Sequence, residues 1–228
     1  MKIIIQCAGS KHADAGCLKD QAGNHISFVA HPDSAAAIGS HNRARPDDPV
    51  DPSGTTWRQR LVNYNAAFRE SGKNPLALLP AGALYKPQAY TELRRCVDPT
   101  DAFILSAGWG LVRADFLLPD YDITFSKQSI VAKESRRSID DEGWRDFNQL
   151  SDANLYGENL HFFGGSEYLK LFYRLIDSLD IPQTGEIVIH YKVVPVRRTG
   201  YRYEKFIGNA STNWHYIALR SHLQSLSD

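Results

Sequence analysis

Residues 103–125 read FILSAGWGLVRADFLLPDYDITF, and this stretch decides the fold that we expect. The continuous apolar run 103–105 is typical of a strand that is covered on both faces of a sheet. The run stops at the small residues 106–108, which leave room for a ligand to approach the backbone. In open α/β sheets, ligands bind at the carboxyl ends of strands. The stretch therefore predicts a buried strand with a binding site at its end.

Aromatic and acidic side chains that can bind or react with a ligand follow this strand. Trp109 comes directly after the turn, and Asp120, Tyr121 and Asp122 follow Pro119. We interpret them as a site in which a pair of carboxylates reaches a glycine-lined cleft. The alternative is a core tryptophan with two turn-forming aspartates, because Asp favours turns for backbone reasons alone.

Three other stretches, residues 2–8, 160–163 and 186–196, also read as strands. The first ends in Gly-Ser-Lys at 9–11 and the second in Gly-Gly-Ser at 164–166, which are turns whose N–H groups suit an anion. Bare tight turns would explain both equally. Together these strands predict an α/β fold with a mixed, largely parallel sheet flanked by helices. The residues expected to bind substrate at the strand ends are Cys7, Ser10, Tyr85, Ser106, Gly108, Trp109, Tyr121, Gly164 and Gly165.

Helices are expected between these strands. Thr56 to Gln59 forms a capping box, and an apolar stripe begins at Trp57 and is closed by Gly72. Further helices are expected after Pro87, after the turn 164–166, and at the C-terminus. We expect one domain, 1–228, with a long irregular insertion or lid at 12–55 and a C-terminal basic and aromatic segment with a helix at 197–228. The prolines of residues 43–51 predict irregular structure there.

The composition excludes several classes of protein. The chain of 228 residues has a formal net charge of zero and is 43% hydrophobic, so it is globular, and no global field draws it to nucleic acid or to a membrane. Its three cysteines show no metal-like spacing, and no apolar run approaches the ~20 residues of a membrane span. We expect a cytoplasmic protein that contacts no membrane, with no cofactor and no metal.

Contact with nucleic acid would therefore depend on local patches of cations. Cations and aromatic residues interleave in residues 197–206, which suits phosphates and exposed bases. An edge strand with one wet face is the alternative. The candidate DNA-binding residues are Arg58, Arg136, Arg137, Arg197, Arg198, Tyr201, Arg202 and Lys205.

Five motifs resemble those of the YaaA-like superfamily along nearly the whole chain. They are QCAGSK at 6–11, NPLALLPAGALY at 74–85, ILSAGWGLVRADFLLPDYDITF at 104–125, FFGGSEY at 162–168 and TNWHY at 212–216. The resemblance implies a YaaA-like α/β fold that binds DNA, in a group linked to protection of DNA and, more distantly, to phage-defence DNA glycosylases. This chain has Asp122 where YaaA proper has arginine, and its segment between Lys11 and Asn74 is much longer.

The leading hypothesis is a DNA glycosylase that acts in phage defence. It would excise a modified base, such as a bulky hydroxymethylated or glucosylated one, from duplex DNA by hydrolysing the N-glycosidic bond. A carboxylate below the sugar would stabilise the positive transition state, and the base would be flipped out of the duplex. The candidate catalytic residues are Asp122, Asp120, Asn213, His215 and Lys11. The alternatives are a non-catalytic DNA-binding protein of stress protection and an N-glycosidase or transferase of free nucleosides or nucleotides.

Overall fold

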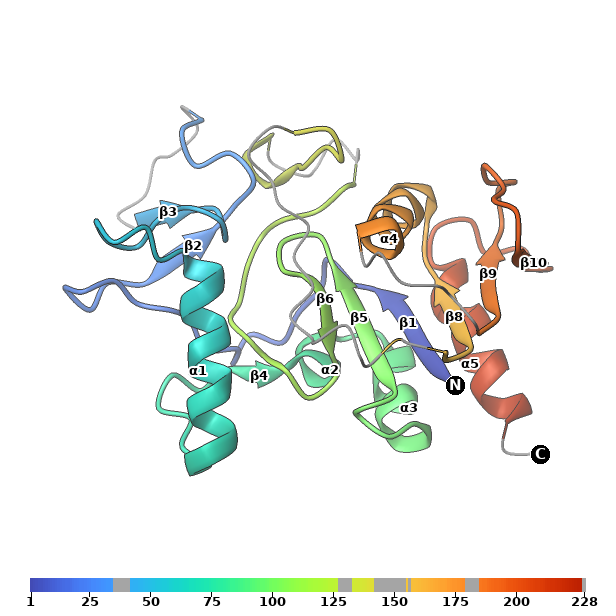
Figure 1. Cartoon of the computed structure of the whole chain (residues 1–228), viewed down its shortest axis with the longest axis horizontal. Coiled ribbons are helices and arrows are strands. Elements are labelled where there is room, and N and C mark those ends of the chain that lie inside the picture. The colour runs from blue at the N-terminus through green and yellow to red at the C-terminus, as the bar shows by residue number, and fades with distance from the viewer. Residues whose placement is uncertain (35–41, 127–132, 142–154, 156, 179–184, 227–228) are drawn as a thin grey trace.

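The computed structural model describes residues 1–34, 42–126, 133–141, 155, 157–178 and 185–226. Its centre is a six-stranded sheet with the order β10-β9-β8-β1-β5-β6 (Figure 1). The strands are β1 (Lys2–Gln6), β5 (Ala102–Ser106), β6 (Gly110–Arg113), β8 (Leu160–Phe163), β9 (Ile187–Tyr191) and β10 (Tyr201–Lys205). Neighbours run parallel except β6, which is antiparallel to β5. The α/β class and the mixed, largely parallel sheet are confirmed.

Helices cover both faces of this sheet. The described residues form five α-helices: α1 (Trp57–Ser71), α2 (Ala81–Leu84), α3 (Gln88–Cys96), α4 (Ser166–Ser178) and α5 (Trp214–Ser225). Side chains of β8 show the two layers, because the ring of Phe162 stacks on Phe172 of α4 whereas Phe163 contacts His222 of α5. The helix α3 packs against α5, and α2 against α3. One face is therefore covered by α4 and the other by α2, α3 and α5.

The four inner strands β9, β8, β1 and β5 are buried because their sequences are largely apolar on both sides. Ile3, Ile4 and Ile5 of β1 are fully buried, and every residue of β5, β8 and β9 is buried as well. A strand that is hydrophobic without alternation needs cover on both faces, which parallel sheets with crossover helices provide. The chain begins with the strand that occupies the middle of the sheet, between β8 and β5.

The helix α1 begins and ends where its sequence signals stand. The hydroxyl of Thr56 accepts a hydrogen bond from the backbone N–H of Gln59, at 3.2 Å. At the other end Gly72 has a φ of 68°, a left-handed conformation that glycine adopts without steric cost. Trp57 and Leu61 are buried, as the apolar stripe predicts. The Thr56 N-cap and the glycine stop are confirmed, whereas the side chain of Gln59 donates to Asn63 at 3.0 Å.

The segment 12–55 contains more regular structure than its sequence suggests. Its strands β2 (Ile26–Phe28) and β3 (Asn42–Ala44) pair in parallel, so the expectation of irregular structure is wrong for the beginning of residues 43–51. The carboxylate of Asp20 accepts hydrogen bonds from the side chains of Asn24 and Asn42, at 3.0 and 2.5 Å. The carboxylate of Asp20 thus links the residues before β2 to the first residue of β3. Prolines interrupt the chain between β3 and α1.

Two further short elements lie near the central stretch. The strands β4 (Leu79–Pro80) and β7 (Leu117–Leu118) form an antiparallel pair, and a single 3₁₀ turn, η1 (Lys133–Ser135), follows the stretch.

The strand expected at 186–196 ends at Tyr191, and Val193 and Val194 beyond it are exposed. The basic and aromatic run forms β10 at the edge of the sheet, which was the alternative interpretation of its pattern.

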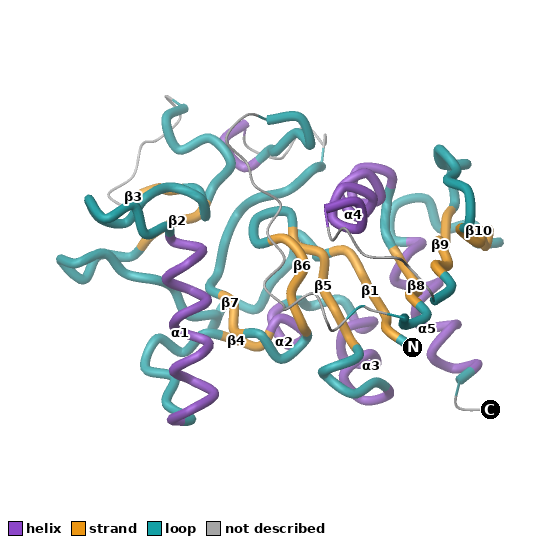
Figure 2. The backbone as a smooth tube through the Cα atoms, in the orientation of Figure 1, coloured by secondary structure: helices purple, strands orange, loops and turns teal. Residues whose placement is uncertain are grey.

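The topology brings five strand ends to one edge of the sheet. β1, β5, β8, β9 and β10 are parallel, so their carboxyl ends and the loops that follow them lie together (Figures 1 and 2). Within the described part of the chain, none of the helices combines the length and the apolar character that crossing a membrane requires. The edge with the strand ends is where the fold places a ligand site.

Candidate functional site

A cleft of about 680 Å³ lies at this edge, and four segments far apart in the sequence form it. They are the end of β1, residues 122–126, the start of α4, and the start of α5. The lining residues are Gln6, Gly9, Lys11, Asp122, Ile123, Thr124, Phe125, Ser126, Gly165, Ser166, Glu167, Tyr168, Thr212, Asn213, Trp214, His215 and Tyr216. The volume lies within the range of small-molecule and cofactor sites. Four of the five candidate catalytic residues therefore line one cleft.

Asp122 is held in this cleft by its backbone. Its N–H donates to the carbonyl of Phe28 at 2.8 Å, which joins the stretch 119–125 to the end of β2. The side chain is exposed, and its Oδ2 accepts a hydrogen bond from the hydroxyl of Ser135. Since that bond uses one acceptor site of the carboxylate, further acceptor sites remain for a ligand.

The start of α5 brings Asn213 and His215 into the cleft. Asn213 occupies the N-cap position, but its side chain makes no capping hydrogen bond and is exposed. His215 is 4% exposed, and neither of its ring nitrogens has a hydrogen-bond partner among the described residues. Burial lowers the pKa of His215 to about 4, so the imidazole is neutral at pH 7. A neutral imidazole offers one donor and one acceptor to a ligand.

The turn between β8 and α4 is tied to the end of β1. The N–H of Gly165 donates to the side-chain oxygen of Gln6 at 2.6 Å. Gly165 lines the cleft, as expected of a substrate-binding residue, but Gly164 is closed off by packing. A Cβ at Gly164 would lie 2.5 Å from the ring of Phe162, so this glycine makes room for the core rather than for a ligand.

Sequence reasoning missed several lining residues. Glu167 lies in the first turn of α4 and adds a second carboxylate to the cleft beside Asp122, and it pairs with Lys170 at 2.9 Å. Gly9 faces open space and is a lining glycine in place of Gly108. The signal for Glu167 was present in the motif FFGGSEY, in which the carboxylate stands two residues after the second glycine. Ser10 is exposed but does not line the cleft.

A buried network of hydroxyls lies beneath the cleft. The hydroxyl of Tyr121 lies 2.7 Å from that of Tyr85 and accepts from Ser106 at 2.9 Å. The thiol of Cys7 lies 3.1 Å from the hydroxyl of Tyr168. Burial raises the pKa of Tyr85, Tyr121 and Tyr168 well above the usual value of a phenol, so these groups stay protonated.

This burial corrects the roles expected for part of the network. Cys7, Tyr85 and Ser106 are buried and line neither of the two larger clefts, so a substrate cannot reach them. Tyr121 is 3% exposed, and the amine of Lys11 lies 4.2 Å from the centre of its ring. Cys7, Tyr85 and Ser106 therefore support the residues above them, whereas Tyr121 lines the smaller cleft.

The turn 106–109 is also closed, which corrects the expected roles of Gly108 and Trp109. The hydroxyl of Ser106 accepts from the N–H groups of Gly108 and Trp109, at 3.2 and 3.0 Å. A Cβ at Gly108 would lie 3.1 Å from the side chain of Ile123, and Trp109 is fully buried with its ring 4.9 Å from that of Phe28. Trp109 is thus a core tryptophan and cannot stack on a base.

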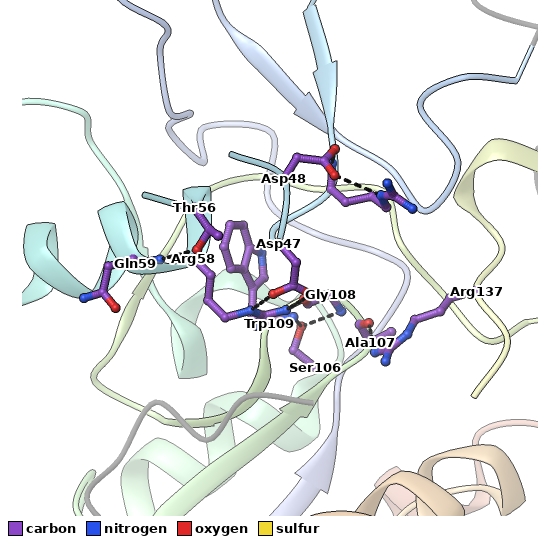
Figure 3. Close-up of polar contacts among 11 residues, drawn as sticks. Asp47, Asp48, Thr56, Arg58, Gln59, Ser106, Ala107, Gly108, Trp109 and Arg137 are labelled. Carbon is purple, nitrogen blue, oxygen red and sulfur yellow. Dashed lines mark hydrogen bonds and ion pairs between the residues drawn. The ribbon is translucent and has the colours of Figure 1, made fainter. Parts of the chain in front are cut away.

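Two arginines bind the carbonyl groups of this turn (Figure 3). Arg58 donates to the carbonyl of Gly108 at 2.9 Å and pairs with Asp47, and Arg137 donates to the carbonyl of Ala107 at 2.7 Å. Both arginines are at most 4% exposed. This burial argues against the role in DNA binding expected for Arg58, whereas Arg137 also lines a third cleft of about 340 Å³ beside Arg136.

Asp120 does not line the larger cleft. It is exposed and lines a second cleft of about 490 Å³ together with Cys17, Lys19 and His25. Asp122 lines both clefts. The two carboxylates share the smaller cleft, but only Asp122 reaches the larger one, so Asp122 is the better candidate for chemistry at the strand ends.

Two of the four cations in residues 197–206 are paired with carboxylates. Arg198 contacts Asp177 at 2.5 Å, Arg202 contacts Glu186 at 2.8 Å and also Glu204, and Tyr201 packs against Tyr173. Arg197 lies over the ring of Tyr203, and Arg136 donates to the carbonyl of Ser126. Lys205 is exposed at the carboxyl end of β10. The segment therefore carries less free positive charge than its composition indicates.

Comparisons of the chain with protein-family models, with curated proteins and with solved structures find no significant match.

Proposed function

We propose that this protein hydrolyses the N-glycosidic bond of a modified base in DNA. The observation that carries the proposal is the convergence of Asp122, Lys11, Asn213 and His215 in one cleft at the carboxyl ends of parallel strands. The motif resemblance to the YaaA-like superfamily points in the same direction. We propose that the protein acts in the cytoplasm and in phage defence, where modified bases mark foreign DNA.

The carboxylate of Asp122 would stabilise the transition state. Breaking an N-glycosidic bond builds positive charge on the sugar, and a fixed carboxylate below the ring lowers the energy of that state. Asp122 is suited to this role because its backbone is anchored to β2 and its Oδ2 is oriented by Ser135. Glu167 lies in the same cleft and would orient the attacking water.

The groups at the start of α5 would recognise the base. The neutral imidazole of His215 and the uncommitted amide of Asn213 together supply donors and acceptors for the edge of a flipped base. His215 pairs with no described residue, so a ligand that bonds to it removes the cost of burying an unsatisfied group. A cleft of about 680 Å³ has room for a base that carries an extra substituent.

The loops beside the cleft would engage the duplex. Val193, Val194, Val196 and Ile207 are the most exposed large apolar residues of the described chain, between 69% and 92% exposed. The amine of Lys192 joins their two loops by donating to the carbonyls of Gly208 and Ala210. Apolar side chains of this kind insert between base steps in many proteins that kink or open DNA. Exposed Lys205 at the end of β10 would contact phosphate.

A second candidate function is hydrolysis of free nucleosides. It is favoured by the ion pairs of Arg198 and Arg202, which leave few cations for phosphates, and by the net charge of zero. Under this candidate the same carboxylate acts on the same bond, but no duplex is bound. The third possibility, DNA binding without catalysis, gives no role to Asp122.

The experiment that tests the proposal separates Asp122 from Asp120. Purified protein is incubated with phage DNAs that carry unmodified, hydroxymethylated or glucosylated bases, and abasic sites are scored by alkaline cleavage. We expect abasic sites in one modified DNA. Asp122→Asn should lower the rate at least about 100-fold, because a preorganised charge at the reacting centre is lost. Asp120→Asn should keep the rate within about twofold, since Asp120 lines the other cleft.

Each other outcome rejects the proposal in a distinct way. An equal loss of rate in Asp122→Asn and Asp120→Asn would show that the larger cleft is not the catalytic centre. Bound DNA without abasic sites would favour the non-catalytic function. Release of base from free nucleosides alone would favour the second candidate.

A further inference from the structure

Three histidines meet beneath α5, on the face of the sheet opposite α4. His161 lies on β8, His190 on β9 and His222 on α5, and one ring nitrogen of each lies within 4.8 Å of the others. The Nδ1 of His161 and the Nε2 of His190 are 3.2 Å apart. The strands place these two side chains on one face, because His190 is paired with Phe163, two residues beyond His161.

The ring nitrogens of the three histidines do not all have hydrogen-bond partners among the described residues. His161 and His190 are each 8% exposed, and one hydrogen bond between them uses a single proton. The buried Nε2 of His222 has no hydrogen-bond partner among the residues described. Three imidazoles whose ring nitrogens lie within 4.8 Å of one another thus converge beneath α5.

A carboxylate orients the middle histidine of this cluster. The Oε2 of Glu204, which is paired with His190 in the sheet, lies 3.4 Å from Nδ1 of His190. If Nδ1 carries the proton toward this carboxylate, the lone pair of Nε2 faces the other histidines. A carboxylate behind a histidine in this way is the usual second shell of a metal ligand. Arg202 is close but is itself paired with Glu186 and Glu204, so its charge is compensated.

We propose that His161, His190 and His222 bind one Zn²⁺ ion. Tetrahedral zinc with bonds of about 2.0–2.1 Å spaces its ligand nitrogens roughly 3.3 Å apart, close to the separation of the first pair. His222 completes the site by a small shift of α5 or a rotation of its ring. Three imidazoles suit zinc among the common divalent ions and leave one position for water. The sequence did not predict this site, because its ligands lie 29 and 32 residues apart without a motif.

The ion would fix the helix that carries the cleft residues. His222 and His215 lie seven residues apart on α5, about 10 Å along the helix axis. A bond from zinc to His222 joins α5 to both β8 and β9, so the ion would hold Asn213 and His215 in place. The role is structural, and it does not depend on the reaction that occurs in the cleft.

Zinc titration tests this site directly. Full-length protein is freed of metal by dialysis against a chelator and titrated with Zn²⁺ against a chromophoric competitor. We expect one tight equivalent, a higher midpoint of thermal unfolding with zinc than without, and tetrahedral absorption bands when Co²⁺ replaces Zn²⁺. Glu204→Gln should weaken binding about 10- to 100-fold through the second shell, and His222→Asn should weaken it further. His215→Asn, a change on the same helix, should still bind one tight equivalent of Zn²⁺.

The wild-type titration decides the proposal even if a variant fails to fold. A wild-type protein that binds no tight equivalent of zinc overturns it. So does a His222→Asn protein that is folded by circular dichroism and binds zinc as the wild type does, because the ion would then lie elsewhere.

Discussion

At the scale of single residues, His215 carries the clearest chemical signature in the cleft. It is buried, neutral at pH 7, and without a hydrogen-bond partner among the described residues. Such a group costs stability in the folded protein, and proteins tolerate that cost mainly at functional sites. The cost should therefore be visible in the folding equilibrium.

The pH dependence of stability provides the measurement. The pKa of His215 is about 4 in the folded protein and near 6.5 in the unfolded chain, so between these values only the unfolded chain takes up the proton. The free energy of unfolding should fall as the pH is lowered through this window. His215→Phe should reduce that slope by at most about 1.4 kcal/mol per pH unit.

Urea denaturation of wild type and variant at pH 7, 6 and 5 measures this difference. His12→Gln serves as the control, because His12 is exposed and should leave the slope unchanged. If the free energy of unfolding changes with pH in the same way in wild type and in His215→Phe, then His215 is not a buried neutral imidazole in the folded protein.

The sequence predicted the candidate site only in part, and the aspartates show why. Alternation along an extended chain places Asp120 and Asp122 on the same side, and both do line the smaller cleft. Only Asp122 also reaches the larger cleft, because the bond of its N–H to Phe28 fixes where the chain turns. That bond comes from a segment about 94 residues earlier, which no local pattern reveals.

At the scale of elements, local signals fixed the ends of α1 but not its place in the fold. Thr56 and Gly72 mark its termini in the sequence. Its attachment to the rest of the protein depends on Asn65, which is buried and was not singled out by any pattern. The side chain of Asn65 donates to the carbonyl of Leu117 at 3.0 Å and accepts from its N–H at 2.7 Å. One side chain thus pairs with both backbone groups of a residue in β7.

Removing this side chain should be costly. Asn65→Ala leaves the buried N–H and carbonyl of Leu117 without their partner, and each such group costs about 1–3 kcal/mol. We expect the free energy of unfolding to fall by about 2–4 kcal/mol, measured in urea. Asn63→Ala, in the same helix but exposed, should change it by no more than about 0.5 kcal/mol. Similar losses in both variants would contradict a special role for the bridge to β7, since alanine is the better helix former and propensity alone predicts no loss.

At the scale of the whole molecule, the balance of charges separates the two candidate functions. With a net charge of zero, the proposed attraction to DNA would depend on a few exposed cations near the strand ends. Each phosphate contact that releases a counterion steepens the decline of affinity with salt. A nucleoside hydrolase would bind its uncharged substrate without such dependence.

Binding to a modified duplex should therefore weaken steeply with salt. Lys205→Gln should reduce the slope of log affinity against log salt by about one, because one phosphate contact is lost. Lys73→Gln is the matched control, since Lys73 is exposed and follows the C-terminal end of α1, an end that points away from the carboxyl ends of the strands (Figure 1). Fluorescence anisotropy with a labelled duplex from 50 to about 200 mM salt gives both slopes. Equal slopes for the two variants would remove Lys205 from the DNA-binding surface.

The central position of β1 has a consequence for how the protein is made. β1 lies between β5, about a hundred residues later, and β8, about 160 residues later, so its partners leave the ribosome long after it does. Contacts of such long range close slowly, because the loops between them must first lose their conformational freedom. The apolar run of β1 is therefore exposed while the rest of the chain is synthesised. We expect chaperones to bind the nascent chain at this run.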